Sequence, residues 1–346
     1  MTTIRKTNYF DKFKLKKMIS YLNPNIVDYY TKIFQYFPFS HIHGYLPLCM
    51  KFLPESYVIE DKKEILGMIA LSPAHSNPFK LTISRLFLDN DYFNIGKQLV
   101  DFVIARYGAK GANLFLSVVN VSNDELLELF TKGCGFRQCS TKDLWLIDCS
   151  KLNHNRSSFF RIFKNSDAQD VVDLYNETLI THFKNTLNKR KEEYADAIFK
   201  GLDDNWFLKY IALDENTKKI KAFFSIVTND NENFILTITK SSWFETSFDD
   251  ILSFAYKEIS KRKNKFSLYV KVRKYMQNSV ELENFLKEKG ATLEQSQVVL
   301  VKDFYRVAKD PVKEKILLFN RVNETPAFKV QQWITKNTWK NALNLH

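Results

Sequence analysis

The sequence predicts an α/β (α+β) fold built from two tandem domains, and three observations lead to this expectation. The 346 residues exceed what one compact core usually holds. The predicted strands and helices run in the same order twice, so the copies correspond in element order and spacing, not in residue identity. Between the copies, the composition turns polar at Asn153–Ser158 (NHNRSS). We therefore place an N-terminal domain at residues 1–152, a C-terminal domain at 153–310 and a basic, aromatic tail with a docking helix at 311–346.

The composition is that of a folded protein without a membrane segment. Hydrophobic residues make up 45% of the chain and charged residues 26%, which argues against disorder. No apolar run approaches the roughly 20 residues of a membrane span, and the first residues, MTTIRKTNYF, lack the apolar core of a secretory signal. The four cysteines have no C-x-x-C spacing, so we expect reduced, structural thiols. These features predict a cytoplasmic protein with no membrane partner and no bound metal.

The formal net charge is +12, with 51 Lys and Arg against 39 Asp and Glu. A basic protein can attract nucleic acid, a membrane surface or an anionic cofactor. Here the basic residues are spread along the chain, with only short clusters at Lys12–Lys17 and Lys261–Lys263, and no nucleic-acid-binding motif occurs. The sequence therefore argues against a nucleic-acid partner.

The first copy is predicted to contain a strand, two helices, a hairpin, and then alternating strands and helices. The strand and the two helices are expected at Ile4–Lys6, Asp11–Tyr21 and Asn25–Phe37. A charged turn separates the two hairpin strands, Ser56–Glu60 and Ile65–Leu71. The remaining elements are, in order, a strand at Leu81–Leu88, a helix at Gly96–Arg106, a strand buried on both faces at Ala112–Val119, a helix at Asn123–Lys132 and a strand at Asp143–Asp148.

The second copy repeats this order. Its expected elements are a strand at Phe159–Phe163, a helix capped by Ser166 and Asp167, a helix at Glu192–Phe199, hairpin strands at Trp206–Leu213 and Ile220–Val227, a strand at Asn233–Thr239, a helix at Phe248–Arg262, a strand at Phe266–Val272, a helix at Glu281–Lys289 and a strand at Gln297–Asp303.

The stretch Leu81–Leu99 (LTISRLFLDNDYFNIGKQL) is a candidate anion site. The strand Leu81–Leu88 leads into a polar loop, Asp89–Asn94, and Ile95-Gly96 opens the next helix. The free N–H groups of a first helical turn and the helix dipole both favour phosphate. A structural turn without a ligand is the alternative interpretation.

Each half of the chain resembles the Gcn5-related N-acetyltransferase (GNAT) fold, over Ile4–Asp148 and Phe159–Asp303. The pyrophosphate loop of that family, Arg/Gln-x-x-Gly-x-Gly/Ala, corresponds here to the hexad from Asp91 to Gly96. Gly96 matches the final small residue. Asn94 stands in place of the middle glycine, Asp91 in place of the basic or amide residue, and Lys97 restores a positive charge.

A second family feature is a helix of pattern Asn-x-x-Ala-x-x-Leu-Tyr that ends in Gly-Phe. Asn123–Phe136 (NDELLELFTKGCGF) resembles it, with one extra residue before Gly135. The family's tyrosine, which often protonates the leaving thiolate, falls on Phe130, or on Thr131 if the extra residue is placed earlier. Phenylalanine cannot donate a proton, but solvent can protonate a thiolate, because thiols are fairly acidic.

The resemblance implies two tandem acyl-CoA N-acyltransferase (GNAT) folds, each with a mixed, mostly antiparallel, twisted sheet flanked by helices. It also implies direct transfer of an acetyl group from acetyl-CoA, the co-substrate, to an amine of a small-molecule or peptide acceptor in the N-terminal half. The thioester carbonyl would accept a hydrogen bond from a backbone amide near Leu86–Leu88. The cofactor-binding residues implied are Leu86, Phe87, Leu88, Asn94, Ile95, Gly96, Lys97, Asn123 and Phe130. We expect Gly96→Trp to abolish acetyl-CoA binding and to leave the fold intact.

The sequence does not identify the catalytic side chains. No glutamate lies on Leu81–Leu88, so His75 and Asp89 are the candidate bases, with an ordinary polar strand end as the alternative for each. His41 and His43 have the spacing of two metal ligands, but no third ligand stands near them, and exposed loop histidines are the preferred interpretation.

The second copy departs further from the family pattern. Its corresponding loop, Lys240–Phe248 (KSSWFETSF), has no glycine and carries Trp243, Phe244 and Phe248, which would obstruct a close approach of backbone to phosphate. We therefore expect a degenerate partner domain that buttresses the first and walls its acceptor groove. Two alternatives stay open: a catalytically inactive GNAT-fold protein used for interaction or ligand sensing, and an aminoacyl- or peptidyl-transferring relative that binds tRNA.

Overall fold

The computed structural model describes residues 2–8, 10–11, 14–15, 55–62, 64–71, 77–89, 92–148, 160–195, 206–214, 216–228, 230–242 and 247–304. All of them belong to one compact unit, Met1–Phe304. Several predicted features lie outside the described residues: the helix Asn25–Phe37, the pair His41 and His43, the polar boundary Asn153–Ser158 and the tail 311–346.

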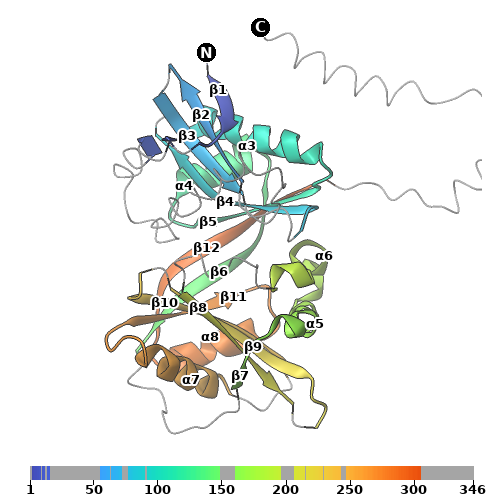
Figure 1. The fold of residues 1–346 in the computed structure, drawn as a ribbon, viewed down its shortest axis with the longest axis vertical. Coiled ribbons are helices and arrows are strands. Elements are labelled where there is room, and N and C mark those ends of the chain that lie inside the picture. Colours follow the sequence, from blue (N-terminus) through green and yellow to red (C-terminus); the bar gives the residue numbers. More distant parts are fainter. Residues whose placement is uncertain are drawn as a thin grey trace, which may run out of the picture. The chain divides into compact units, whose positions relative to one another are not determined.

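The first copy contains the predicted strands and the helices predicted at Gly96–Arg106 and Asn123–Lys132, whereas most of the predicted helix Asp11–Tyr21 lies outside the described residues (Figure 1). Its strands are β1 (Thr3–Lys6), β2 (Glu55–Asp61), β3 (Glu64–Leu71), β4 (Lys80–Leu88), β5 (Leu114–Asn120) and β6 (Arg137–Ile147). Its helical elements are α3 (Tyr92–Gly108), α4 (Asp124–Glu128) and the π-helical turn η2 (Leu129–Gly133). β6 begins six residues before its predicted first residue, Asp143. Its first half is polar and therefore has no apolar strand pattern, but it pairs with β12 of the other copy.

The second copy repeats this order. Its strands are β7 (Phe160–Ile162), β8 (Trp206–Leu213), β9 (Ile220–Thr228), β10 (Asn233–Lys240), β11 (Ser267–Arg273) and β12 (Thr292–Asp303). Its helices are α5 (Ala168–Thr178), α6 (Lys184–Leu187), α7 (Phe248–Ser260) and α8 (Ser279–Glu288), with 3-10 turns η4 (Asn165–Asp167), η5 (Thr181–Phe183) and η6 (Lys191–Glu193). The described start of the expected helix Glu192–Phe199 is the short turn η6.

The strands form one sheet in the order β1-β2-β3-β4-β5-β12-β6-β11-β10-β9-β8-β7. Only β4 with β5 and β10 with β11 pair in parallel among the described strands, and the other neighbours are antiparallel. The predicted fold class, a mixed and mostly antiparallel sheet flanked by helices in each copy, is confirmed. The two sheets are, in addition, continuous.

The last strand of each copy completes the sheet of the other. β12 pairs with β5 from Gln297↔Asn120 to Asp303↔Leu114, and β6 pairs with β11 from Leu268↔Ile147 to Arg273↔Lys142. β12 and β6 also pair with each other, and Figure 1 shows the orange β12 beside the green β6. The two copies are therefore joined through backbone hydrogen bonds and not only through a linker.

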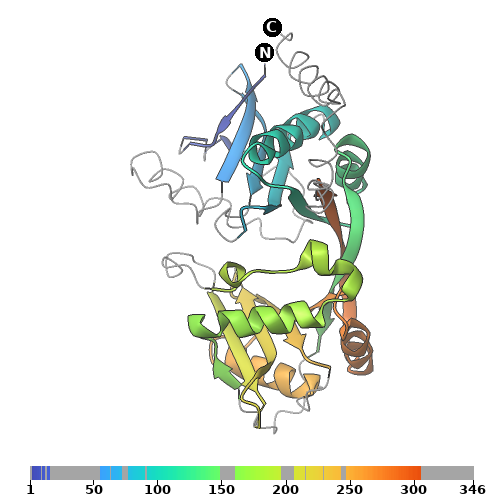
Figure 2. The same ribbon diagram turned by 90° about the vertical axis from the view of Figure 1, so that its right-hand side faces the viewer.

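Three hydrophobic cores flank the sheet. The first lies between α3 and strands β2 to β5 and contains Phe115 and Val119 of β5. The second lies between α7, α8 and the strands of the second copy. The third lies under α5 and includes Val299 and Val301 of β12, and Val118 of β5 packs against it. β5 was predicted to be buried on both faces; the face with Phe115 and Val119 is buried, and the face with Leu114, Leu116 and Val118 is half-buried against the third core. Figure 2 shows the yellow-green segment that contains α5 and α6 lying over the face of the sheet that carries the third core.

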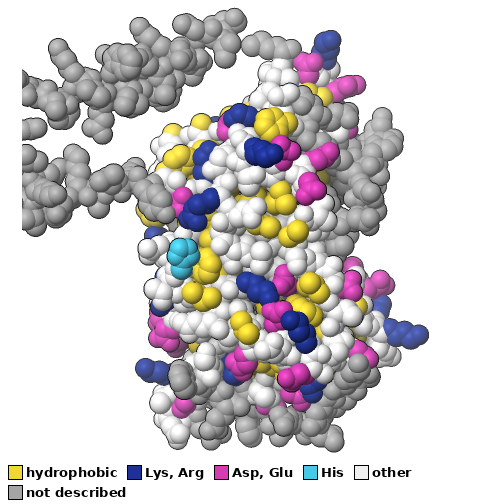
Figure 3. Space-filling view, turned by 180° about the vertical axis from the view of Figure 1, so that it is seen from behind, with side chains coloured by type: hydrophobic (Ala, Val, Ile, Leu, Met, Phe, Trp, Pro, Cys, Tyr) yellow, Lys and Arg dark blue, Asp and Glu magenta, His cyan; other side chains and the backbone are white. Residues whose placement is uncertain are grey.

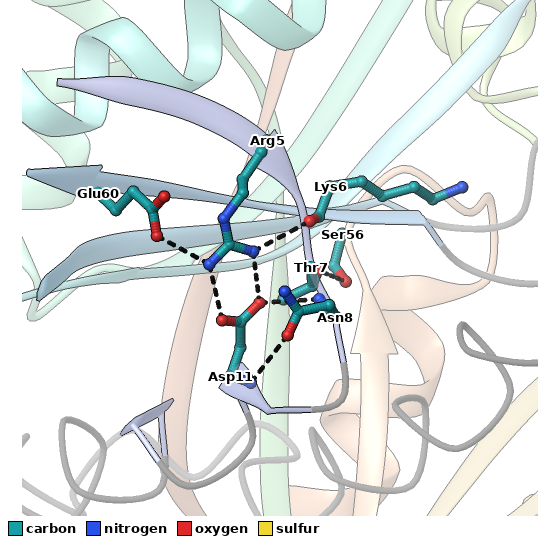
Figure 4. A network of polar contacts seen from close by, with 7 residues as sticks. All are labelled: Arg5, Lys6, Thr7, Asn8, Asp11, Ser56 and Glu60. Carbon is teal, nitrogen blue, oxygen red and sulfur yellow. Dashed lines mark hydrogen bonds and ion pairs between the residues drawn. The ribbon is translucent and has the colours of Figure 1, made fainter. Parts of the chain in front are cut away.

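Both copies fasten their first strand to the following helical turn with the same ion pair. Arg5 donates from Nη1 and Nη2 to the two carboxylate oxygens of Asp11 at 2.7 and 2.8 Å (Figure 4). Arg161 donates to both oxygens of Asp167 at 2.8 Å. The pattern Arg-x5-Asp therefore recurs at the same structural position in both copies. The sequence analysis found a correspondence in element order only and did not identify this shared pair.

We predict that Asp167→Asn lowers the free energy of unfolding at pH 7 by about 1–2 kcal/mol. The hydrogen bonds from Arg161 lower the pKa of Asp167 below its ordinary value. A carboxyl group whose folded pKa is lowered stabilises the fold above its unfolded pKa of about 3.9 and loses this effect as the pH falls through the folded pKa. Urea unfolding at pH 7 and pH 3 checks this: the difference between wild type and variant should shrink at pH 3. The exposed Asp173→Asn on the same helix is the control, and an equal difference at both pH values would contradict the prediction.

None of the described helices has the length and apolar composition needed to cross a membrane. On the face shown in Figure 3, the described Lys and Arg side chains are interspersed with Asp and Glu and form no continuous basic stripe.

Candidate functional site

The two parallel strands of the first copy separate halfway along their length. β4 and β5 pair only from Lys80↔Leu114 to Ile83↔Ser117. On the other side of β4, Ala70 faces Arg85 while Leu71 faces Ile83, so Ser84 is the extra residue of a β-bulge. The Ser84 hydroxyl donates to the Ala70 carbonyl at 3.1 Å. Because a bulge bends its strand, this position marks the point where β4 turns away from β5.

A cavity of about 80 Å³ lies at the split. That volume holds a small polar or acyl group, or several water molecules. The residues that line it come from β4, β5, α4, η2 and the exchanged strand β12: Ile83, Ser84, Arg85, Leu86, Phe87, Ser117, Val118, Val119, Asn120, Asn123, Leu126, Phe130 and Gln295.

The ladder between β3 and β4 directs backbone groups toward this cavity. The amide of Asp89 donates to the Leu66 carbonyl at 3.0 Å, which fixes the alternation of the antiparallel pairs. By that alternation, Phe87 exchanges hydrogen bonds with β3, whereas the N–H groups of Leu86 and Leu88 point toward the side of β5. Fixed backbone dipoles of this kind suit a carbonyl oxygen or a developing oxyanion.

The helix after β4 begins earlier than predicted. α3 starts at Tyr92, so Asn94, Ile95 and Gly96 lie inside the helix and not at a loop–helix junction, and the expected loop Asp89–Asn94 is three residues shorter. The early start follows from tertiary packing, because the ring of Phe93 lies against Gly133 of η2. Asn94 is exposed, whereas Ile95 is buried in the first core. The N–H groups of the first turn of α3 still lie just after the end of β4.

Gly96 is required for packing and has no left-handed backbone conformation. A Cβ at this position would collide with Leu129 of η2 and would lie 2.9 Å from Leu88 Cδ1 of β4. The expectation that Gly96→Trp leaves the fold intact is therefore wrong, since the helix could not keep its distance from β4 and η2.

We predict that Gly96→Ala lowers the free energy of unfolding by about 1–3 kcal/mol through overpacking. Gly108→Ala is the matched control, because nothing lies within 4 Å of a Cβ added at the other end of α3. That control should be neutral or slightly stabilising. Urea unfolding of both variants checks the contrast, and equal stabilities would contradict the packing role of Gly96.

Lys97 forms an ion pair with Asp101, one turn further along α3, at 2.5 Å between Nζ and Oδ2. The hydrogen bond to that carboxylate raises the pKa of Lys97. Lys97 is therefore positively charged near the start of α3, with its charge partly balanced by Asp101. Its contact with a phosphate stays a prediction.

The segment after β5 contains a capped helix and a π-helical turn. The Asn123 side chain caps α4 by accepting a hydrogen bond from the Leu126 amide at 3.1 Å. The predicted helix Asn123–Lys132 is α-helical only to Glu128, and the Cys134 amide then donates to the Leu129 carbonyl five residues earlier, at 2.9 Å. Such a wide turn accommodates one inserted residue, and the resemblance places one extra residue before Gly135.

Phe130 forms part of the cavity wall, is 1% exposed, and packs edge-on against Phe136 with ring centroids 5.0 Å apart. The neighbouring Thr131 donates its hydroxyl to the Leu127 carbonyl at 2.6 Å, within its own helix. The proton-donor position of the resemblance therefore holds a hydrocarbon ring in this chain.

No described residue of the cavity wall is His, Asp, Glu or Tyr. Of the two candidate bases, Asp89 is exposed just after β4 and is not part of the cavity wall, and His75 lies outside the described residues. Asp91 of the hexad also lies outside the described residues. Burial raises the pKa of Cys134 to about 11, so this thiol stays protonated at neutral pH. The described site thus offers backbone dipoles, the guanidinium of Arg85 and otherwise neutral side chains, and its described wall contains no His, Asp, Glu or Tyr to act as a general acid or base.

Of the residues implied by the resemblance, four line the cavity: Leu86, Phe87, Asn123 and Phe130. Sequence reasoning missed the polar residues beside them. Ser84 and Arg85 interrupt the apolar pattern of their strand, a signal of the bulge. Gln295 comes from β12 of the other copy, and no local pattern could have assigned it to this site.

The equivalent place in the second copy is closed. β10 keeps an unbroken register with β9 up to Lys240↔Ala222, so it has no bulge there. The buried Arg273 at the end of β11 donates to the Ile238 carbonyl at 2.5 Å and to the Thr239 hydroxyl at 2.7 Å, and Asn278 donates to the Lys240 carbonyl at 2.9 Å. Phe248 is buried at the start of α7, whereas Trp243 and Phe244 lie outside the described residues. These contacts fill the space beyond the paired part of β10 and β11, and the degeneracy of the second copy stays a prediction.

The second copy also contacts the start of β4. Lys80 forms an ion pair with Glu193 of η6 at 3.4 Å and donates to the Asn188 carbonyl. The guanidinium of Arg190 lies 5.1 Å from the centroid of the Phe79 ring. Segments of the second copy thus lie beside the strand that carries the bulge.

Comparison with known proteins agrees with this architecture. Residues 24–136 match the model of the acetyltransferase (GNAT) family. The chain matches no curated protein. Among solved structures, a tandem GNAT protein from the clavulanic acid biosynthesis pathway is similar with a TM-score of 0.58 and 9% identity, over 88% of this chain and 98% of that one. A GCN5-related N-acetyltransferase from Sphaerobacter thermophilus has a TM-score of 0.56 and 9% identity, over 87% and 95% of the two chains. At such identities the likeness is one of fold.

Proposed function

We propose that this chain, whose residues 24–136 match the model of the acetyltransferase (GNAT) family and whose described part has the tandem GNAT fold, transfers an acetyl group from acetyl-CoA to an amine in its N-terminal half. The observation that carries the proposal is the split between β4 and β5, which leaves a cavity and two backbone amides beside it. The second copy, closed by Arg273 and Asn278, would support the first without a site of its own.

The residues present fit an acyl-CoA. The first-turn amides of α3 and its dipole would hold the pyrophosphate, with Lys97 nearby. Leu126 and Phe130 give the cavity an apolar wall for a thioester arm. The Leu86 amide would donate to the thioester carbonyl oxygen.

Bound acetyl-CoA would supply an activated acyl carbon. The acceptor nitrogen would form a bond to that carbon, and the Leu86 amide would stabilise the oxyanion of the tetrahedral intermediate. The C–S bond then breaks, the nitrogen loses a proton to solvent, and the thiolate gains one from solvent. Since a thiol has a pKa of about 8.5, the thiolate can leave without the acid that Phe130 cannot provide.

Release of free CoA thiol tests this function. The full chain is mixed with acetyl-CoA and a panel of amines and short peptides, and amine-dependent thiol release above hydrolysis in buffer is expected. Saturable binding of acetyl-CoA without any amine-dependent release would favour the second candidate, a catalytically inactive protein for ligand sensing or interaction. Phe130 and the absence of an acid or base in the described cavity wall are the observations that favour this second candidate.

A further inference from the structure

Ser117 of β5 is a buried polar residue on an apolar face of the sheet. It is 4% exposed and lies between Phe115 and Val119, which belong to the first core. The residues that pair with it on the neighbouring strands, Ile83 and Leu300, belong to the same core. A hydroxyl in such surroundings is expected to form a hydrogen bond, because burial of a polar group without a partner costs stability.

The Ser117 hydroxyl forms no hydrogen bond with any described residue. It is also not one of the unpartnered side-chain atoms that are fully enclosed by protein, among which is the Oγ atom of Ser253 in α7. Ser117 lines the cavity at the split between β4 and β5. Its hydroxyl therefore borders the space of the cavity, where a bound group can reach it.

Ser117 marks the closed end of the split. It is the last residue of β5 that pairs with β4, opposite Ile83, and its side chain is on the face covered by α3. The first turn of α3, which would hold the pyrophosphate, follows the other end of β4. The arm of a donor bound there would extend along the split past Leu86, so that its acyl end would lie near Ser117.

We propose that Ser117 donates a hydrogen bond from its hydroxyl to the acyl carbonyl oxygen of the bound donor, beside the Leu86 amide. This inference rests on the proposed acyl transfer. The carbonyl oxygen gains negative charge when the amine nitrogen bonds to the acyl carbon, and it loses that charge when the C–S bond breaks. A hydrogen bond to a charged oxygen is stronger than one to a neutral oxygen, so the hydroxyl would stabilise the intermediate more than the bound donor. Ser117 keeps its proton throughout.

Calorimetry with two ligands tests this hydrogen bond without any acceptor amine. Acetyl-CoA has the carbonyl group, and S-ethyl-CoA, a thioether of nearly the same size, lacks it. Ser117→Ala should weaken the binding of acetyl-CoA by about three- to tenfold, the effect of one neutral hydrogen bond, and that of S-ethyl-CoA by less than about twofold. With an amine that supports thiol release, Ser117→Ala should also lower kcat by about tenfold or more.

Urea unfolding of Ser117→Ala separates this role from a structural one. The variant should be at least as stable as the wild type, because the hydroxyl that it removes has no partner in the unliganded protein. Ser253→Ala is the matched control, since Ser253 is also 4% exposed and its unpartnered hydroxyl is enclosed in the second copy. This control should bind both ligands as the wild type does.

An equal loss of affinity for the two ligands in Ser117→Ala would overturn the proposal, since the effect would not depend on the carbonyl group. So would an unchanged affinity for acetyl-CoA, or a Ser117→Ala protein that is clearly less stable than the wild type. If the wild type binds neither ligand, the proposed function itself fails. If the wild type binds both ligands and Ser117→Ala does not distinguish them, only the present inference fails.

Discussion

A chain that ends at residue 291, before β12, is expected to lose the cooperative unfolding of its N-terminal half. The truncation removes the strand that pairs with β5 and leaves that edge open. It also removes four apolar side chains that are at most 6% exposed: Val298, Val299, Leu300 and Val301. Burying such a side chain contributes about 1.5–3 kcal/mol, so the loss is comparable to the 5–15 kcal/mol of a typical domain.

The control for this truncation is a chain that ends at residue 304. It retains β12 and the whole compact unit and lacks only the residues beyond it. Hydrogen exchange of the β4 and β5 amides, together with urea unfolding, should show native-like protection in the 1–304 chain and its loss in the 1–291 chain. Full protection of β5 in the shorter chain would contradict the structural importance of the exchanged strands.

The variant Ser84→Trp is expected to weaken acetyl-CoA binding at least 100-fold while the protein stays folded. Ser84 is exposed and lines the cavity at the bulge, so an indole there would fill the space proposed for the acyl group. The folding cost should be small, because the substitution removes one side-chain hydrogen bond, worth about 1 kcal/mol. Thermal unfolding with and without acetyl-CoA measures both effects at once.

Ser242→Trp is the matched control for that variant. Ser242 is exposed just after β10, in the corresponding loop of the second copy, where the gap between the strands is closed by Arg273. Stabilisation by acetyl-CoA should be unchanged in Ser242→Trp and absent in Ser84→Trp. The reverse pattern would place the donor in the second copy.

Much of the fold follows from local sequence signals. Composition and spacing predicted the β2–β3 hairpin, and runs of β-type, apolar residues predicted β4 and β5. The exchange of β6 and β12 was not predictable, because a strand such as Gln297–Asp303 has the same apolar pattern whichever sheet it joins.

The sequence pointed to the place of the cavity better than to the residues of its wall, and the binding roles of these residues stay a prediction. The resemblance pointed to the joint between β4 and α3, and four of its implied residues line the cavity. The sequence predicts Gly96 to be a glycine of the phosphate loop. The structure shows that it lies within α3, where its closeness to Leu129 serves helix packing. The sequence did not identify Arg85 and Gln295 as residues of the cavity wall. Arg85 lines the cavity where β4 separates from β5, and Gln295 belongs to β12, which comes from the other copy, so both depend on contacts between residues distant in sequence.

Titration calorimetry of acetyl-CoA into the full chain is the direct test of an acyl-CoA site between β4 and β5. We expect one saturable site per chain, and its loss in Ser84→Trp. Absence of saturable binding, or binding that Ser84→Trp leaves unchanged, would contradict an acyl-CoA site between β4 and β5.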